Sequence, residues 1–409
     1  MTDLLTSLTS GLATLTLNRP EALHALTTHM CRNMIQALLA WRADDSVRAV
    51  LIEHAPGTRG FCAGGDIRMI AESGAGDGQA AREFFLTEYR LNHLLFTYPK
   101  PVIAIMDGIT MGGGVGISMP AKFRVSTENT IYSMPETGIG LFPDVGGGWY
   151  LPRKPGQVGM WLALTGARLK AVDCLTAGIA THFIEASKLP QLVQDLASPP
   201  TGGAGVGGGG RVGYDAGGAV AAPPARPPSG RFAATSRAAG SQSDPGCFAA
   251  GCGAAGGGEN SLLQSLARFI SNPGAPKELT PENIERIDRI FALGSVEAIF
   301  SVLAADGSDW ARAQLGTLAT KSPQTLKVAF RQLREGARMQ SFADEMVQEY
   351  RIACRVVARH DFIEGVRALI IDKDNKPCWN PPTLEGVTEA MLDEIFASLP
   401  AGEKWSPLT

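Results

Sequence analysis

The sequence predicts an α/β protein in its first half and a mostly helical protein in its second. Residues 1 to about 190 alternate short apolar runs, typical of strands, with segments whose apolar residues recur at helical spacing. Residues 259–409 carry helical patterns and lack β-rich runs. Between the halves the composition changes abruptly to glycine and alanine. We therefore divide the 409 residues into 1–195, 199–258 and 259–409.

Four segments define the elements of the first half. Residues 12–17 alternate Leu with Ala or Thr, which predicts a strand. Residues 28–41 have apolar side chains at helical spacing and predict a helix. Residues 49–53 and 101–106 are continuous apolar runs, so they predict strands buried on both faces.

Helical patterns account for most of the second half. Thr280, followed by Pro281 and Glu282, is a typical start of a helix, and so is Ser322 followed by Pro323. The expected helices cover residues 261–270, 281–291, 296–303, 322–334 and 342–359.

The middle segment, 199–258, has the composition of a linker. From Thr201 to Gly258 it holds 18 Gly and 14 Ala and no Leu, Ile or Met. Without large aliphatic side chains it cannot offset the entropy of ordering its backbone, so we expect no packed structure there. Two origins stay open: a natural Gly/Ala/Pro-rich linker, or the product of a reading-frame shift in GC-rich coding DNA.

Composition narrows the functional classes. The 37 Lys and Arg nearly balance the 40 Asp and Glu, so no global field attracts nucleic acid or an anionic membrane. No apolar run reaches the length of a membrane-spanning helix. The first basic residue is Arg19, which argues against a leader peptide and favours a cytoplasmic location. Seven scattered cysteines without a CxxC pair indicate reduced thiols, and no ligand spacing indicates a metal site.

Two glycine-rich turns follow apolar strands. Gly64 and Gly65 come after the strand at 49–53, and the run 112–114 comes after the strand at 101–106. Such turns leave unpaired N–H groups at the start of a helix, and the missing Cβ atoms let a substrate oxygen approach them. Two turns side by side make an oxyanion hole, whereas either alone also fits a helix packed tightly on a strand.

Two acids stand eight residues apart in apolar, glycine-punctuated chain. They are Glu136 and Asp144. Burial in such surroundings raises the pKa of a carboxyl group and suits it to proton transfer or nucleophilic attack near neutral pH. For either acid alone, a helix cap or a turn-stabilising contact is the competing interpretation.

Together these clusters resemble the crotonase superfamily of CoA-thioester enzymes. The matching segments are C-A-G-G-D-I at 62–67, K-P-V-I-A-I-M-D-G-I-T-M-G-G-G-V-G at 100–116 and M-P-E-T-G-I-G-L-F-P-D-V-G-G-G at 134–148. Within the superfamily the match is closest to the branch that hydrolyses 3-hydroxyisobutyryl-CoA. The resemblance covers roughly residues 10–195 and 260–400. It implies a crotonase-like fold of repeated ββα units, followed by a helical C-terminal part.

The resemblance also implies roles for single residues. The N–H groups of Gly65 and Gly113 would form the oxyanion hole for the thioester carbonyl. Glu136 would be the catalytic carboxylate, either as a general base on water or as a nucleophile that forms a mixed anhydride. Asp144 would be the second catalytic acid, acting on the 3-hydroxyl or transferring a proton. Glu88 would bind substrate together with Gly113, Glu136 and Asp144.

A further segment resembles the family's CoA-contacting turn. It is N-R-P-E-A-L-H-A-L at 18–26, with His24 where Asn is usual. The CoA-binding residues implied are Ala22, His24, Ala63, Asp66 and Ile67. No cofactor is implied beyond the CoA of the substrate, and family analogy suggests a homo-oligomer.

Gly116 separates two reactions of the superfamily. Typical hydratases carry a second glutamate at this place, because adding water to a double bond needs an acid and a base. The function implied is hydrolysis of 3-hydroxyisobutyryl-CoA, in valine breakdown. Two alternatives remain: an enoyl-CoA hydratase or isomerase, and a non-catalytic oligomeric scaffold.

Overall fold

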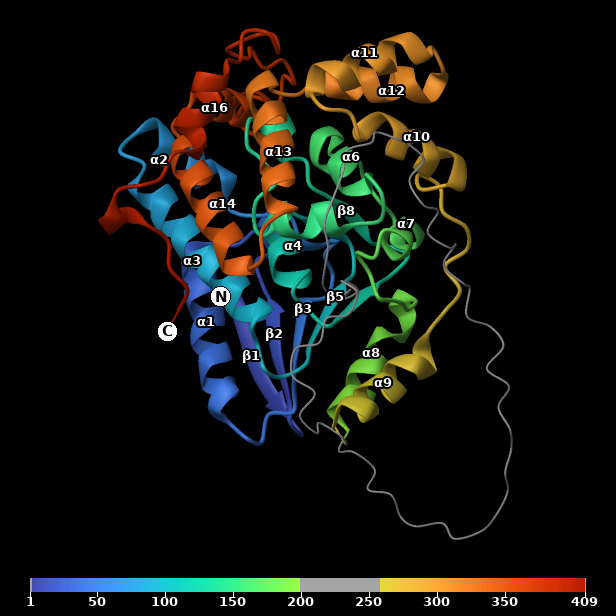
Figure 1. The fold of residues 1–409 in the computed structure, drawn as a ribbon. Coiled ribbons are helices and arrows are strands. Elements are labelled where there is room, and N and C mark those ends of the chain that lie inside the picture. Colours follow the sequence, from blue (N-terminus) through green and yellow to red (C-terminus); the bar gives the residue numbers. More distant parts are fainter. Residues whose placement is uncertain (1, 199–257, 409) are drawn as a thin grey trace, which may run out of the picture.

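The computed structural model describes residues 2–198 and 258–408. Within them, two β-sheets form in the first half and helices pack around them (Figure 1). The larger sheet has the order β1-β2-β3-β5-β7-β9 and the smaller one β4-β6-β8. In chain order the strands are β1 Leu4–Thr9, β2 Leu12–Leu17, β3 Ala49–His54, β4 Gly60–Cys62, β5 Val102–Met106, β6 Ile109–Met111, β7 Phe123–Ser126, β8 Ile131–Ser133 and β9 His182–Phe183.

A ββα unit repeats along the first half. One strand joins the larger sheet, the next joins the smaller sheet, and a helix follows. The units β3-β4-α2 and β5-β6-α4 show this order, with α2 over Ile67–Ala75 and α4 over Gly113–Ser118. In the next unit a 3₁₀ turn, η2 (Glu136–Ile139), follows β7 and β8. Apart from the antiparallel pair β1–β2, the strands pair in parallel. This order confirms the predicted crotonase-like fold.

Both faces of the larger sheet are buried, which explains its continuous apolar runs. Alternate side chains of a strand point to opposite faces. Val50 and Ile52 of β3 face the main hydrophobic cluster, while Leu51 joins a second cluster with Leu192 and Leu266. The second cluster is covered by α8 (Leu189–Ala197) and α9 (Gly258–Phe269), which pack against each other.

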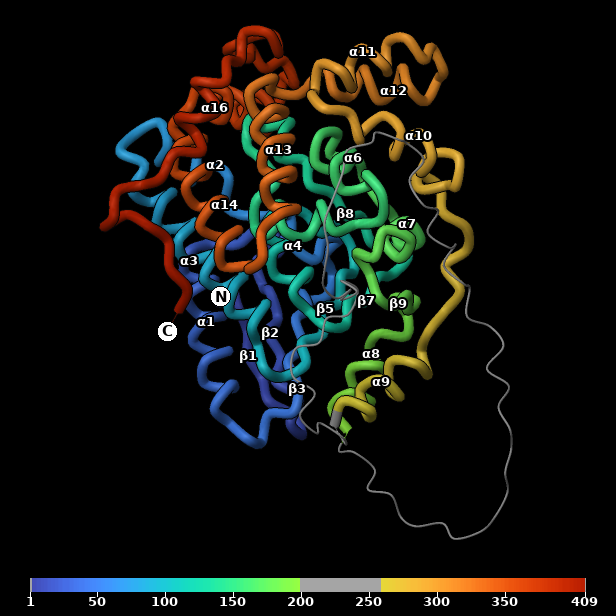
Figure 2. Tube along the Cα trace, viewed as in Figure 1, coloured from blue at the N-terminus to red at the C-terminus, as the bar shows by residue number. Residues whose placement is uncertain are grey.

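The remaining helices pack around the two sheets and against one another (Figure 2). The main hydrophobic cluster runs from Leu4 to Trp405 and so includes both halves of the chain. The helices not yet named are α1 Thr28–Ala43, α3 Gln79–Phe96, α5 Gly147–Tyr150, α6 Val158–Thr165, α7 Ala171–Thr176, α10 Pro281–Phe291, α11 Val296–Asp306, α12 Asp309–Leu318, α13 Pro323–Gly336, α14 Phe342–Val356, α15 His360–Val366 and α16 Glu389–Phe396. Helix α1 lies beside β1, and the pair α11–α12 lies at the periphery (Figure 2).

Most elements expected from periodicity are present. The strands at 12–17, 49–53 and 101–106 correspond to β2, β3 and β5, and the expected helix starts at Pro281 and after Ser322 are observed. Both helices have the expected cap, since the hydroxyls of Thr280 and Ser322 accept backbone N–H groups. The helix expected over 342–359 ends at Val356. The expectation for 199–258 falls on residues that, but for Gly258, lie outside the described ones.

Candidate active site

Two neighbouring strands of the smaller sheet end in the two glycine turns. Strands β4 and β6 pair in parallel, so the turns after them meet at the same edge. Gly64 and Gly112 have φ angles of +122° and +47°, which side-chain-bearing residues rarely adopt. A Cβ added to Gly112 would lie 3.2 Å from Gly64 Cα. The two turns therefore lie against each other.

The turns present two backbone donors, the N–H groups of Gly65 and Gly113. Gly113 is the first residue of α4, where an N–H group has no intrahelical acceptor. Among the described residues, neither N–H donates a hydrogen bond outside its own element. Both glycines line one cavity of 70 Å³. An oxyanion hole needs two such free N–H groups at one cavity.

Glu136 lies next to these donors. It begins η2, directly after β8, and β8 is the neighbour of β6. A Cβ on Gly112 would lie 3.4 Å from Glu136 Oε1, and the residue is 4% exposed. Its Oε2 has no hydrogen-bond partner among the described residues. Burial and the nearby Asp144 raise the pKa of Glu136, whereas Lys321 acts to lower it.

Asp144 closes the same cavity from the loop after η2. It is 4% exposed, and its Oδ2 accepts a hydrogen bond of 2.9 Å from the Tyr89 hydroxyl. Burial raises the pKa of Asp144 to about 7, and the hydrogen bond from Tyr89 opposes this rise. At neutral pH Asp144 therefore exchanges its proton readily.

Glu88 supplies a third carboxyl group from α3. It is 2% exposed, and a Cβ on Gly113 would clash with its Oε1. Burial, followed by the charges of Asp144 and Glu136, raises the pKa of Glu88 well above its usual range. Three carboxyl groups that line one small cavity oppose one another's ionisation.

The cavity that these groups share is otherwise apolar. Its walls include Ile67, Ile70, Phe84, Phe85, Ile139 and Leu141. Glu88, Glu136 and Asp144 all line it, so the structure brings together the acids and glycines that the sequence indicated. Small apolar walls with a few polar groups suit a short branched acyl group.

The expected CoA-contacting turn lies beside the cavity. Ala22 ends a 3₁₀ turn over Pro20–Ala22, and Ala63 donates its N–H to Leu23 O. Asp66 caps α2 and forms a 2.9 Å ion pair with Arg19. Of the expected CoA-binding residues, Ala63 and Ile67 line the cavity.

His24 is fully buried in this turn. Its Nδ1 accepts the Arg19 N–H at 3.0 Å, so the proton lies on Nε2, which donates to Thr58 Oγ1 at 2.9 Å. Burial, with the nearby His54, lowers the pKa of His24 to about 4. Both ring nitrogens of His24 are therefore engaged within the protein, which leaves its ring no nitrogen free for CoA.

The second half of the chain supports the loops that carry Glu136 and Asp144. Lys321 Nζ lies over η2, 3.3 Å from a Cβ placed on Gly138, and Ser322 donates its N–H to Thr137 O. The next loop is held by Glu349 of α14, which accepts N–H groups from Gly146 and Gly148.

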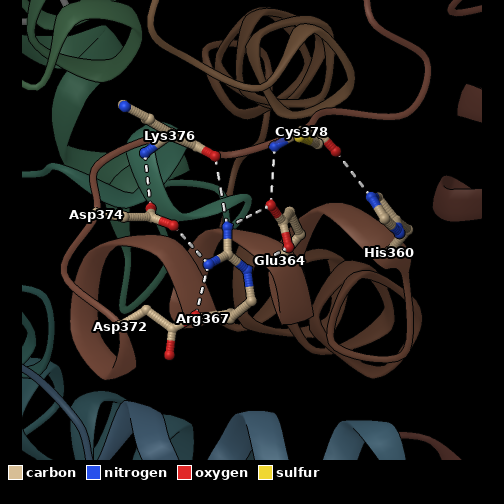
Figure 3. Close-up of polar contacts among 7 residues, drawn as sticks. All are labelled: His360, Glu364, Arg367, Asp372, Asp374, Lys376 and Cys378. Atoms are coloured by element: carbon tan, nitrogen blue, oxygen red, sulfur yellow. Dashed lines mark hydrogen bonds and ion pairs between the residues drawn. The ribbon is translucent and has the colours of Figure 1, made fainter.

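Helix α15 packs directly on η2. A Cβ on Gly365 would overlap the backbone of Ile139, one of the cavity walls. Figure 3 shows how the chain after α15 is fastened back to it: Arg367 pairs with Glu364, Asp372 and Asp374. Glu364 also accepts a hydrogen bond from the N–H of Cys378. The carbonyl oxygen of Cys378 accepts one from Nε2 of His360. This network ties residues 372–378 to α15, the helix that packs on η2.

Sequence reasoning missed Tyr89, Lys321 and Glu349. Tyr89 is adjacent to Glu88 but carries no motif of its own. Glu349 did leave a signal, because Glu345 and Glu349 lie one turn apart on a helix face shared with Met346 and Ile352, both buried. Charged residues on a buried apolar face are uncommon and indicate a buried polar contact.

The sequence predicted neither a membrane-spanning helix nor a metal site, and the structure can be searched for both only within its described residues. There, no helix is both long enough and apolar enough to cross a bilayer, and no group of three or more His, Cys, Asp and Glu is placed to hold a metal ion.

Comparisons with known proteins give one consistent family. The enoyl-CoA hydratase/isomerase profile matches residues 12–205 and 252–396. A protein of Danio rerio named "3-hydroxyisobutyryl-CoA hydrolase, mitochondrial" is 42% identical over 385 residues, which is 94% of this chain and 87% of the relative. The Homo sapiens protein of the same name is 37% identical over 388 residues, covering 94% of this chain and 86% of that one.

Two solved structures share the whole fold. A carnitinyl-CoA dehydratase from Mycobacterium thermoresistibile superposes with a TM-score of 0.79 at 34% identity, covering 98% of this chain and 97% of that one. An enoyl-CoA hydratase from Rhodobacter sphaeroides 2.4.1 gives a TM-score of 0.77 at 31% identity, covering 99% and 100%.

The expectation of a cytoplasmic location is wrong in the light of these relatives. The names of both hydrolases place them in mitochondria. The expectation rested on composition and on the residues before Arg19. A folded enzyme body does not record its compartment, because targeting segments are read by transport machinery and not by the fold.

Proposed function

The chain belongs to the enoyl-CoA hydratase/isomerase family, and we propose that it hydrolyses 3-hydroxyisobutyryl-CoA to 3-hydroxyisobutyrate and free CoA. The two hydrolases described above support this substrate, since they match 94% of the chain. The observation that carries the proposal is the position of Glu136. Its buried carboxyl group lies against the two glycine turns, where a thioester carbonyl would bind.

The N–H groups of Gly65 and Gly113 bind the carbonyl oxygen. Their hydrogen bonds strengthen as the oxygen becomes negatively charged in the tetrahedral intermediate, so they stabilise the transition state more than the substrate. One such donor contributes roughly 3–4 kcal/mol to lowering the barrier. Because the donors belong to the backbone, side-chain substitution does not remove them.

Glu136 delivers the attack on the carbonyl carbon. As a general base it takes a proton from a water molecule, whose oxygen forms the new C–O bond while the C–S bond to CoA breaks. As a nucleophile it forms a mixed anhydride that water then hydrolyses. Both routes need an ionised Glu136, and Lys321 favours that form by acting against the rise in its pKa.

Asp144 and Glu88 complete the site. With a pKa of about 7, Asp144 either binds the 3-hydroxyl of the acyl group or passes a proton to the departing thiolate. Burial favours the protonated form of Glu88, and in that form Glu88 offers an O–H donor to the substrate. The turn containing Ala22 and His24, with Ala63, Asp66 and Ile67, is placed beside the cavity to receive CoA.

The environment of Gly116 argues against a hydratase, although a solved relative is named one. A Cβ there would lie 2.7 Å from both Asn92 Nδ2 and Val145 Cβ. A glutamate therefore has no room to point into the cavity from this position. Without it, hydration lacks its second acid-base group, while thioester hydrolysis keeps all the groups it needs.

The test is release of free thiol from the thioester. The purified protein is mixed with 3-hydroxyisobutyryl-CoA and a thiol reagent, and Glu136→Gln is compared with Glu72→Gln, the same change at an exposed position of α2. We expect wild-type release with Glu72→Gln and a loss of about 10²–10⁴-fold with Glu136→Gln.

Three outcomes would overturn this function. Folded wild-type protein that releases no CoA would favour a scaffold. Undiminished release by Glu136→Gln would exclude Glu136 from the reaction. Loss of absorbance from an α,β-unsaturated acyl-CoA, without thiol release, would identify a hydratase.

A further inference from the structure

The loop that carries Asp144 has an unusual backbone. Val145 and Gly146, which follow the acid directly, both have left-handed φ angles, of +52° and +92°. A β-branched residue such as valine rarely adopts this conformation, because its side chain crowds the backbone. Something outside the loop must therefore hold it in place.

That support is the carboxyl group of Glu349. Its Oε2 accepts the N–H of Gly146 at 2.8 Å, and its Oε1 accepts the N–H of Gly148 at 3.1 Å. Glu349 is fully buried on α14, more than 200 residues further along the chain. The two N–H groups converge on one carboxylate, which is how turns bind anions.

Gln332 of α13 links this carboxylate to the other side of the loop. Its Nε2 donates to Glu349 Oε1 at 3.2 Å and to Pro143 O at 2.8 Å. Asp144 is thus flanked by held positions, Pro143 before it and Gly146 after it. Gly147 adds a bond within the loop, from its N–H to Asp144 O at 2.8 Å.

Glu349 shares its buried surroundings with Glu345, one turn earlier on α14. Burial and the charge of Glu345 raise the pKa of Glu349 well above its usual range, while the N–H groups of Gly146 and Gly148 act to lower it. Burial also raises the pKa of Glu345, to about 8. The oxygens of Glu349 accept three N–H bonds, from Gly146, Gly148 and Gln332, and these bonds hold the loop.

We propose that Glu349 is a positioning residue, which holds the Asp144 loop in its reactive geometry through Gly146 and Gly148. The inference rests on the function proposed above. It gives the second half of the chain a part in catalysis through the position of Asp144. Glu349 itself does not line the cavity, so it acts through Asp144 and not on the substrate.

The test compares Glu349→Gln with Glu345→Gln. Both changes are nearly isosteric, and both residues are equally buried on the same helix. Only Glu349→Gln replaces an oxygen that accepts a loop N–H with an NH₂ group that faces this N–H. We expect Glu349→Gln to lower kcat on 3-hydroxyisobutyryl-CoA by about 100-fold, the effect of a small misplacement of a reacting group. KM changes by less than about threefold, because the oxyanion donors and the CoA turn are unaltered. Glu345→Gln keeps kcat within about threefold of wild type.

A double-mutant cycle with Asp144→Asn separates positioning from general damage. If Glu349 acts through Asp144, Glu349→Gln causes no further loss of kcat in the Asp144→Asn background. Multiplying losses would overturn the proposal, as would equal effects of the two glutamine variants or a loss confined to KM. Should Glu349→Gln fail to fold, Gln332→Leu removes the bonds to Pro143 and Glu349 and enters the same cycle with the same criteria. A wild-type protein that releases no CoA would instead refute the proposed function.

Discussion

Three buried carboxyl groups line one small cavity. They supply the acid-base groups of the site and lower the stability of the folded protein. Glu88, Glu136 and Asp144 are each at most 4% exposed, and burial raises the pKa of all three. A raised pKa suits a carboxyl group to proton transfer at pH 7. The same burial makes ionisation costly for the folded protein, so function and stability oppose each other here.

The pH dependence of stability follows from Asp144. The pKa of this group is about 7 when folded, against a usual value of 3.8. Below both values the group is protonated in either state and contributes nothing; as pH rises between them, the unfolded chain ionises first and stability falls. We expect Asp144→Asn to raise the free energy of unfolding at pH 8, by at most about 4 kcal/mol, and much less at about pH 4.

The check is denaturant unfolding of both proteins at the two pH values. A gain of the same size at both would show that Asp144 is not the group whose ionisation destabilises the fold.

At the level of residues, sequence motifs predicted the residues that line the cavity. They did not predict the residues that hold the cavity loops in place. Gly65, Gly113, Glu136 and Asp144 stand in segments that specify their own turns, so their place could be read locally. Lys321 contacts η2 from a segment far away in the sequence, and no local pattern specifies such a partner.

At the level of elements, the C-terminal helices support the site through glycines that leave room for close packing. Gly365 of α15 lies against the Ile139 backbone, so we expect Gly365→Ala to push α15 away from η2. Overpacking of this kind costs about 1–3 kcal/mol, and displacement of η2 should also reduce activity.

The control for this change is Gly316→Ala. Gly316 is an exposed residue of α12 with no atom within 4 Å of an added Cβ, so alanine should stabilise the helix by up to about 1 kcal/mol. Thermal unfolding and thiol release measure both variants. Equal stability of the two would contradict the account of how α15 packs.

Long periodic elements were predictable and short ones were not. Strands β2, β3 and β5 and helices α10, α13 and α14 bury regular faces that periodicity reveals. Strands β4, β6 and β8 have three residues each, too few to establish a period, and depend on pairing with one another. Their positions could be inferred only through the family resemblance.

At the level of the whole molecule, the α/β half and the helical half of the chain share one hydrophobic cluster. The composition of the chain changes at residue 199. The main hydrophobic cluster nevertheless contains side chains from both sides of this point. Helices α8 and α9, which flank the change, pack on each other, and Arg268 pairs with Asp195 at 3.0 Å.

This packing predicts that residues 199–257 can be shortened. We expect replacement by a linker of about ten Gly and Ser residues to preserve the melting temperature and the rate of thiol release, because such a linker spans adjacent helix ends. A variant that folds but is inactive, or that unfolds, would show that this stretch contributes to the enzyme. The two possible origins of the stretch need the nucleotide sequence, where a frame shift predicts a leucine-rich helical pattern in another frame.

The most direct test of the whole account is the vibration of the bound thioester carbonyl. A substrate labelled with carbon-13 at the carbonyl is bound to Glu136→Gln, which retains both backbone donors, and difference infrared spectra are recorded. Two converging N–H donors polarise the carbonyl, so we predict a stretching band at clearly lower frequency than in water. A bound thioester whose band does not move to lower frequency would contradict the oxyanion hole at Gly65 and Gly113.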